Sequence, residues 1–363
     1  MTRAIRVMIY VALIVTSSSG IFFLLPSGVT YRVTERYTFS SDQADNQIWL
    51  AVMLPKDNAY QHVENVQIGW EGDIFRENYR EAEVIRLEGE TAEKGREAIL
   101  EYDVTLLQGR VSWKAEVRMQ DTMSQENIES DAAILANKAK EICGTEPERT
   151  AYKTYTFTAD HLSWPEGNRT EADQSALVAY ESRVGACGEF ANLMTALNRA
   201  CGNPAKSVTG LSMPTLLPPM MSQETTWLHP GAAHAWVEVY DNGVWKVADP
   251  SRASRMPLDS LWFGRIHGQY LSYGEMGAHA QIYASMLAWG DQKGEIIGAM
   301  SAPLRFVAAS EDRENMTVTP TVRVQKVSDV RWFTAGGLCL AVIVASGIIE
   351  SRMRQKEKTV NAG

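Results

Sequence analysis

Cysteine is scarce in this sequence, with four residues in a chain of 363. So few cysteines exclude a small exported domain that depends on a framework of disulfides. The cysteines and histidines also lack the close spacing of a zinc site, and there is no internal repeat or low-complexity tract. We therefore expect neither a metal nor any other cofactor. Hydrophobic residues make up 45% of the chain and charged residues 22%, which is ordinary for a protein with a hydrophobic core.

Positive charge is in short supply as well, since 35 lysines and arginines face 44 aspartates and glutamates. Residues 1–27 and 332–363 each carry a net charge of +2, so the total of −9 leaves −13 for the residues between them. An acidic segment of this kind binds nucleic acid poorly. We therefore exclude nucleic acid as a partner.

Charge is absent altogether from two long stretches, residues 7–25 and 332–349. Each is close to the roughly 20 apolar residues that cross about 30 Å of hydrocarbon. The first stretch could instead be a cleaved signal peptide, but residues 24–28 make a poor cleavage site. The second could be a buried core helix, but its length and its basic flank argue against this. We predict two transmembrane helices, which makes the lipid bilayer a partner.

Basic residues set the predicted orientation of these helices. Arg3 and Arg6 precede the first stretch, and four basic residues follow the second within residues 352–358. Cytoplasmic flanks of membrane spans are enriched in lysine and arginine. Both termini are therefore expected in the cytoplasm, with the residues between the spans outside it.

The first part of the intervening segment has the pattern of β-structure. Apolar and polar residues alternate over residues 31–39, as is typical of a strand with one buried face. Residues 48–54, 98–104 and 111–117 are further strand candidates. They predict an antiparallel β-sandwich, in which we find no catalytic constellation. Its expected role is to support the fold or to present a substrate.

Helices are predicted after the sandwich. Apolar residues recur at helical spacing over residues 128–142, and a second helix is expected to begin at Thr170, with Asp173 placed as in a capping box. A third helix is expected to begin near Cys187 and to end before Gly202. The α-helical part of the chain therefore contains Cys187.

Later segments are less regular. The connection over residues 211–233 is rich in proline and methionine, and is interpreted either as a loop packed on the domain or as an apolar lip over a site or against the bilayer. Strands are expected again at residues 304–307 and 318–327. Cys143 and Cys201 end two predicted helices; they could pair in an oxidising compartment, but we favour two buried free thiols.

Cys187 is a candidate nucleophile because of its place at the start of a helix. There a thiol lies near unsatisfied backbone N–H groups and the positive helix end, which stabilise a thiolate, and one N–H could also bind an oxyanion. Gly185 and Gly188 allow a substrate to approach the backbone, so we predict them as substrate-binding residues. A buried structural cysteine that starts a helix is the alternative, and this segment alone would favour it.

A β-hairpin follows with a histidine and an aspartate. Residues 234–240 and 244–249 are strands on either side of a turn at Asn242 and Gly243, a pair typical of two-residue hairpin turns. Such a turn pairs Tyr240 with Trp245. A three-residue loop would break this pairing and the inference that depends on it.

The pairing brings His234 close to Asp249. Trp236 is then opposite Asp249, and His234 is its diagonal neighbour on the same face of the sheet. Asp249 would hold His234 in its productive tautomer, and His234 would deprotonate Cys187 and later protonate a leaving amine. Trp236 shares this face; we predict it as substrate-binding, although core packing explains it equally well.

Together the three segments resemble the transglutaminase-like superfamily of cysteine enzymes. The resemblance covers residues 125–255 and rests on Gly-Ala-Cys-Gly-Glu-Phe-Ala around Cys187, His-Ala-Trp-Val-Glu-Val from His234 and Ala-Asp-Pro-Ser around Asp249. Where the family usually has Gly-Ile-Pro-Ala-Arg after the cysteine helix, Asn203 and Lys206 replace two of those residues. The resemblance implies a papain-like core, with the cysteine helix packed on an antiparallel sheet, and suggests no calcium site.

The expected fold class is therefore α+β, with a papain/transglutaminase-like core preceded by a β-sandwich-like domain and flanked by two transmembrane helices. The expected activity is acyl transfer through a thioester, first as hydrolysis of an amide or peptide at the cell envelope. One alternative is cross-linking, in which the acyl group of a protein glutamine is transferred to an amine. The other is a non-catalytic binding or assembly module. The predicted order is an N-terminal transmembrane anchor (1–27), a β-rich domain (28–122), a transglutaminase-like catalytic domain (123–330), a C-terminal transmembrane helix (331–350) and a basic cytoplasmic tail (351–363).

Overall fold

The structure is a computed structural model, in which the two predicted membrane spans and the basic tail lie outside the described residues. No helix among the described residues combines the length and the apolar character that crossing a membrane requires. The described residues are 27–41, 46–91, 95–144, 149–165, 175–214, 222–225, 233–255, 259–301, 305–312 and 314–329.

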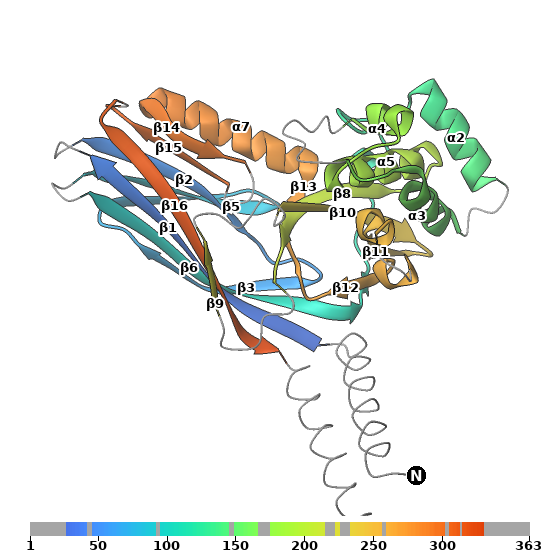
Figure 1. Cartoon of the computed structure of the whole chain (residues 1–363), viewed down its shortest axis with the longest axis horizontal. Helices are drawn as coiled ribbons and strands as arrows, with labels where there is room; N and C mark the ends of the chain where they lie inside the picture. The colour runs from blue at the N-terminus through green and yellow to red at the C-terminus, as the bar shows by residue number, and fades with distance from the viewer. Residues whose placement is uncertain are drawn as a thin grey trace, which may run out of the picture.

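A β-sandwich forms one end of the molecule (Figure 1). Its first sheet has the order β12-β6-β1-β16-β9, with β3 also paired to β6. These strands are β1 (Ser27–Ser41), β3 (Gln61–Gly69), β6 (Arg96–Arg110), β9 (Ser222–Thr225), β12 (Arg265–His267) and β16 (Met316–Asp329).

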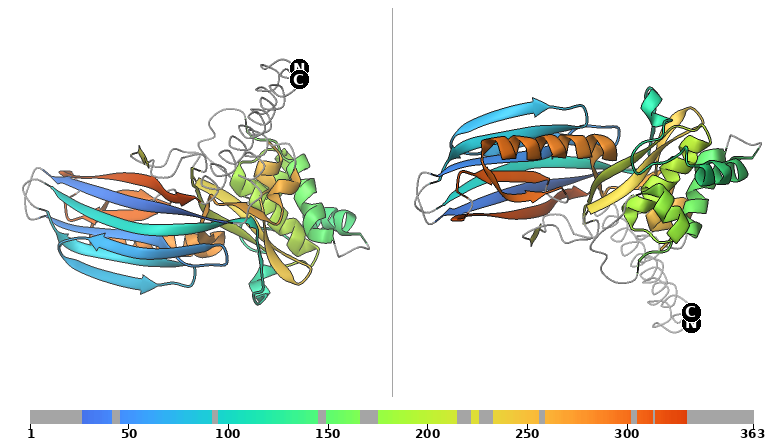
Figure 2. Two further views of the ribbon diagram at one scale, coloured as in Figure 1. Left: turned by 90° about the horizontal axis from the view of Figure 1, so that it is seen from below. Right: turned by 90° about the horizontal axis from the view of Figure 1, so that it is seen from above.

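The second sheet of the sandwich has the order β14-β15-β2-β5-β4. The helix α7 (Met276–Lys293) lies along this sheet (Figures 1 and 2). Nearly every residue of β2 is buried, because one face meets the first sheet and the other meets α7. The strands are β2 (Gln47–Pro55), β4 (Asp73–Asn78), β5 (Ala82–Glu90), β14 (Glu295–Met300) and β15 (Phe306–Ser310).

Alternation in β1 explains how the sandwich core forms. Tyr31, Val33, Tyr37 and Phe39 are fully or almost fully buried and face the core, which confirms the strand predicted for this segment. The strands predicted at residues 48–54 and 98–104 lie within β2 and β6. The strand predicted at residues 111–117 is shorter than expected, because only β7 (Ser112–Trp113) pairs there.

The sandwich includes strands from both ends of the described chain. Val33 of β1 pairs with Val324 of β16, and Val52 of β2 pairs with Phe306 of β15. Strands from residues 295–329, which fall within the predicted domain 123–330, therefore pair with strands from the predicted domain 28–122. The physical reason is that antiparallel pairing joins strands however far apart they lie in the sequence.

The other end of the molecule is a mixed α+β unit. Its sheet has the order β13-β8-β10-β11-β7, and the helices lie on it (Figures 1 and 2). The elements are β8 (Ala205–Ser212), β10 (Ala233–Asp241), β11 (Val244–Ala248), β13 (Tyr270–Glu275), α2 (Ala133–Cys143), α3 (Thr150–His161), α4 (Ala176–Ser182), α5 (Cys187–Ala200) and α6 (Pro250–Ala253), with short 3-10 helices at Met119–Asp121 and Asp259–Trp262.

The helix α5 is at the centre of this unit and begins at Cys187, as predicted. Ala191 and Met194 pack on the sheet against Ala235 and Val237. The opposite side of α5 packs against α2 and α4. A cysteine helix on an antiparallel sheet is thus confirmed.

Two details of the helical unit differ from the sequence-based expectation. The second predicted helix, α4, begins at Ala176 and is capped by Ser175; Thr170 and Asp173 lie outside the described residues. Cys143 and Cys201 form a disulfide, with their Cα atoms 6.2 Å apart, instead of the two free thiols that we favoured. The disulfide joins the C-terminal end of α2 to that of α5.

Candidate active site

The start of α5 places Cys187, a partly buried residue, against the strand β10 of the sheet. Glu189, the third residue of the helix, accepts a hydrogen bond from the N–H of Ala186 at 2.9 Å, which fixes the entry of the chain into the helix. A cysteine at this position has the first-turn N–H groups beside it, because these groups have no partner within a helix.

The two glycines beside Cys187 have different surroundings. A Cβ atom at Gly185 would lie 2.6 Å from the Cβ atom of Glu189, so close packing alone requires glycine there. The N–H of Gly185 donates to the carbonyl of Ser163. Gly188 is buried in the first turn of α5. A substrate-binding role for these two glycines stays a prediction.

The hairpin that carries His234 has the predicted register. Tyr240 pairs with Trp245, and both turn residues, Asn242 and Gly243, have positive φ angles of 51° and 83°. These angles are those of a two-residue turn that matches the twist of its strands. The hairpin pairing predicted from the sequence is therefore confirmed.

His234 and Asp249 lie together, as the predicted strand pairing requires. The Nε2 atom of His234 lies 2.8 Å from Oδ2 of Asp249, and both side chains are buried. Because Nε2 is occupied by Asp249, Nδ1 is the ring nitrogen left for Cys187, and His234 and the N–H of Ala235 are close enough to the thiol to lower its pKa. The structure thus brings Cys187, His234 and Asp249 together as one group.

Asp249 is held by several donors besides His234. It caps α6, where its Oδ1 accepts from the N–H of Arg252 at 2.9 Å and from the hydroxyl of Ser251 at 2.7 Å. The hydroxyl of Tyr270 donates to Oδ2. We did not predict Tyr270 or Ser251 from the sequence. Ser251 could have been found from the Asp-Pro-Ser start of a helix, whereas no local signal marks Tyr270.

The electrostatics of the three groups favour an ion pair. Burial alone would raise the pKa of Cys187, but the hydrogen bond and charge of His234 and the N–H of Ala235 outweigh burial and lower it. Burial would lower the pKa of His234, but Asp249 and Cys187 raise it to about 9. Burial would raise the pKa of Asp249, but His234, Tyr270 and Ser251 lower it to about 2. These shifts make Cys187 more acidic and His234 more basic and keep Asp249 ionised, so they favour transfer of the thiol proton to the imidazole.

Trp236 lies beneath the site and not at its surface. Its side chain is fully buried, and its ring stacks on Tyr270 with centroids 4.8 Å apart. Its indole N–H donates to the hydroxyl of Tyr60 at 3.3 Å, which in turn donates to Glu238 at 2.8 Å. Of the two interpretations that the sequence left open, the structure supports core packing.

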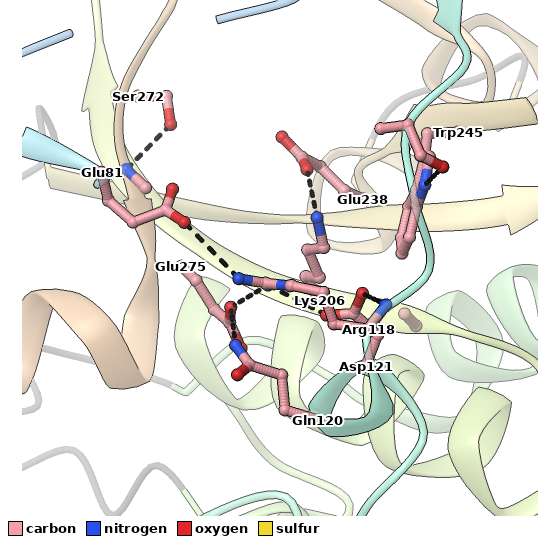
Figure 3. A network of polar contacts seen from close by, with 12 residues as sticks. Glu81, Arg118, Gln120, Asp121, Lys206, Glu238, Trp245, Ser272 and Glu275 are labelled. Carbon is pink, nitrogen blue, oxygen red and sulfur yellow. Dashed lines mark hydrogen bonds and ion pairs between the residues drawn. The ribbon is translucent and has the colours of Figure 1, made fainter.

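Glu238 belongs to a larger network of polar side chains (Figure 3). Arg118 contacts the carboxylate of Glu275 at 2.7 Å and that of Asp121 at 2.9 Å. Lys206 lies 3.9 Å from the carboxylate of Glu238. Burial raises the pKa of Glu238, an effect that Lys206 and Tyr60 oppose. Ion pairs thus connect the sheet to the segment that leads into the helical unit.

The part of the chain that the structure describes contains no group of three histidine, cysteine, aspartate or glutamate side chains arranged to bind a metal ion. A thiol, an imidazole and a carboxylate on a helix and an antiparallel sheet are the parts of a papain-like cysteine acyl-transfer site.

Comparison with known proteins agrees with this arrangement. Residues 136–250 match the family model of the transglutaminase-like superfamily, and Cys187, His234 and Asp249 all lie within the match. This part of the chain therefore has a transglutaminase-like core.

The solved structures that are similar to the chain include two that it covers over most of their own length. One is a candidate cysteine protease from Cytophaga hutchinsonii, with 16% identity, a TM-score of 0.49, and coverage of 84% of this chain and 93% of that one. The other is the periplasmic domain of TgpA from Pseudomonas aeruginosa, bound to ethylmercury, with 14% identity, a TM-score of 0.32, and coverage of 68% and 96%. No curated protein matches the chain, so its function is inferred from the site residues.

Proposed function

We propose that this protein is a membrane-anchored, extracytoplasmic cysteine enzyme that hydrolyses an amide or peptide bond through a thioester. The observation that carries the proposal is the placement of Cys187, a partly buried cysteine with a lowered pKa, beside a buried imidazole that is itself hydrogen-bonded to a carboxylate. A binding module has no need of a thiol with a lowered pKa beside an imidazole with a raised one.

The first half of the reaction forms the acyl-enzyme. The Cys187 thiolate attacks the carbonyl carbon of the substrate, and a C–S bond forms while the carbonyl oxygen gains negative charge. The first-turn N–H groups of α5 are suited to bind this oxyanion. The imidazolium of His234 gives its proton to the nitrogen of the leaving amine, the C–N bond breaks, and a thioester remains on Cys187.

The second half releases the acid. His234, now neutral, accepts a proton from water, the resulting hydroxide attacks the thioester carbon, and the thiolate leaves. Asp249 stays ionised throughout and holds the ring of His234 in place through Nε2. An amine in place of water would give a new amide, so the acceptor distinguishes hydrolysis from cross-linking.

The proposed location outside the cytoplasm is supported by two features. The basic flank at residues 352–358 suits a cytoplasmic tail. The Cys143–Cys201 disulfide suits an oxidising compartment, because the cytosol keeps thiols reduced. Protease treatment of intact cells tests this: the segment between the spans should be cleaved while the tail is protected, and protection of both would contradict the proposed orientation.

The activity is tested with purified full-length protein in detergent and a library of peptides, followed by mass spectrometry. We expect new amino termini from the wild type and none from Cys187→Ala or His234→Ala. Added hydroxylamine should trap the acyl group as a hydroxamate, as a thioester requires. Asp241→Asn, a substitution on the same hairpin but away from the three groups, serves as the folded control. Equal products from wild type and Cys187→Ala would exclude the mechanism.

A further inference from the structure

Two arginines follow the carboxylate of the site on and just after α6. The backbone N–H of Arg252 donates to Oδ1 of Asp249 at 2.9 Å, so the position of this residue is fixed to the catalytic group. Its guanidinium donates to the hydroxyl of Ser212 at 3.0 Å, but Nε is buried without a hydrogen-bond partner among the described residues. A buried N–H of a cation is costly to leave without a hydrogen bond, so Arg252 would gain from an additional acceptor.

Arg255 is held beside the same site by an aromatic ring. Its guanidinium carbon lies 3.9 Å above the ring of Trp164, and Trp164 stacks on Phe190 of α5, three residues after Cys187. The indole N–H of Trp164 donates to the carbonyl of Ser251 at 3.3 Å. The stacked cation is therefore positioned by both elements that carry the catalytic groups.

The charges of the two arginines are not neutralised locally. Within the described ranges, neither guanidinium has an aspartate or glutamate at ion-pair distance. Burial and the neighbouring Arg252 lower the pKa of Arg255, while Asp249 and the thiolate of Cys187 act in the opposite direction, which places Arg255 within electrostatic reach of the nucleophile. This positive pair stands in a segment whose net charge is −13.

We propose that Arg252 and Arg255 form a cationic rim beside Cys187 that binds a carboxylate of the substrate. The planar fork of an arginine pairs with a carboxylate through two parallel hydrogen bonds, and a second arginine nearby adds to the attraction. The inference rests on the proposed function and names its substrate class: peptides with an acidic side chain, or a free terminal carboxylate, next to the bond that is cleaved.

The local charge is tested without any turnover, by alkylation of Cys187 with anionic iodoacetate and neutral iodoacetamide. Both reagents attack the same thiolate, so the ratio of their rates cancels changes in the thiol pKa and reports the potential at the sulfur. We expect the iodoacetate-to-iodoacetamide ratio to fall about fivefold in Arg255→Gln and further in the double variant with Arg252→Gln. Arg110→Gln, an exposed arginine at the end of β6, should leave the ratio as in wild type. An unchanged ratio in both rim variants would overturn the proposal.

The source of the carboxylate is tested with matched peptides. One pair differs by glutamate against glutamine next to the cleaved bond, and another by a free against an amidated C-terminus. We expect kcat/KM to be about tenfold higher for the carboxylate form of one pair in the wild type, and this preference to be lost in Arg255→Gln. No preference in either pair would contradict the rim. A changed alkylation ratio with no cleavage of any peptide would support the rim and contradict the proposed hydrolysis.

Discussion

At the scale of single residues, the pKa of each catalytic group is set by its neighbours. The carboxylate of Asp249 makes the imidazole of His234 a stronger base, and that imidazole makes the thiol of Cys187 a stronger acid. Tyr270 and Ser251 complete the hydrogen bonds of the carboxylate, so that it remains ionised although it is buried. The reactivity of the thiol therefore depends on residues that it does not touch.

The first prediction is a broad pH range of activity with two limits. The thiolate is present above the lowered pKa of Cys187 and the imidazolium is present below about pH 9, so kcat/KM should fall below the first limit and above the second. Asp249→Asn should move the alkaline limit to lower pH, because the charge that raises the pKa of His234 is removed. Thiolate absorbance near 240 nm gives the acid limit independently. A thiol that titrates with the ordinary pKa of about 8.5 would contradict the ion pair.

The second prediction concerns Tyr270, a positioning residue. Tyr270→Phe should lower the free energy of unfolding by about 2 kcal/mol, because a buried hydrogen bond to a charged group is lost. It should also raise the pKa of Asp249, so acid unfolding should begin at a higher pH than in wild type. Urea titrations at several pH values measure both effects. Tyr240→Phe, on the same sheet, is the matched control, and equal behaviour of the two variants would show that the bond has no role.

At the scale of elements, the hairpin and the cysteine helix were predictable because their signals are local. The Asn242–Gly243 turn fixes the register, and the register fixes which side chains share a face. The start and end of α5 follow from Cys187 and Gly202, whose φ angle of 76° is the left-handed conformation expected of a glycine after a helix. Local chemistry thus determined most of the candidate site.

Elements stabilised by tertiary contacts were not predictable in this way. The helix α3 contains four threonines, and the hydroxyls of Thr154, Thr156 and Thr158 donate to backbone carbonyls one turn earlier. Threonine is a weak helix former. The helix α7 buries Ile282, Met286 and Trp289 against the sandwich, but its other positions give no clear apolar stripe. Tyr270 is 21 residues from Asp249, and the contact depends on the pairing of β13 with β8.

The third prediction concerns the disulfide between α2 and α5. Replacement of both Cys143 and Cys201 by alanine should lower the free energy of unfolding by about 2–4 kcal/mol, because the crosslink spans 58 residues of the unfolded chain. Activity at low temperature should persist, because Cys201 is at the opposite end of α5 from Cys187, about 20 Å away. Urea titration with and without reductant provides the measurement. Modification of both thiols by maleimide in unreduced, folded protein would show that the bond is absent.

At the scale of the whole molecule, the two units are joined by partly buried ion pairs as well as by the chain. Arg118 precedes the helical unit, and its guanidinium lies 3.8 Å from Glu81 of the sandwich and 2.7 Å from Glu275 at the end of β13. Arg199 of α5 lies 3.9 Å from the same glutamate. Long-range strand pairing and such ion pairs leave no compositional mark along the sequence, so they could not be predicted from it.

The fourth prediction tests this junction. Glu275→Ala should lower the free energy of unfolding by about 3 kcal/mol, because it leaves Arg118 and Arg199 partly buried near each other without their shared carboxylate. Glu141→Ala, which removes an exposed pair with Lys138, is the control and should have no measurable effect. Urea unfolding followed by tryptophan fluorescence measures both variants. A loss no larger than that of the control would show that the junction is held by apolar packing alone.

The pairing of β1 with β16 has a consequence for how the enzyme would meet its substrates. Val29 and Asp329 are opposite each other in this ladder, so these two residues, near the two ends of the described part of the chain, are about 5 Å apart. With both spans formed as proposed, two adjacent attachments prevent the domain from swivelling as it would on a single stalk. Cys187 would then be kept at a fixed distance from the bilayer and in a fixed orientation. Substrate bonds at other distances from the bilayer would not be cleaved, whatever the sequence around them.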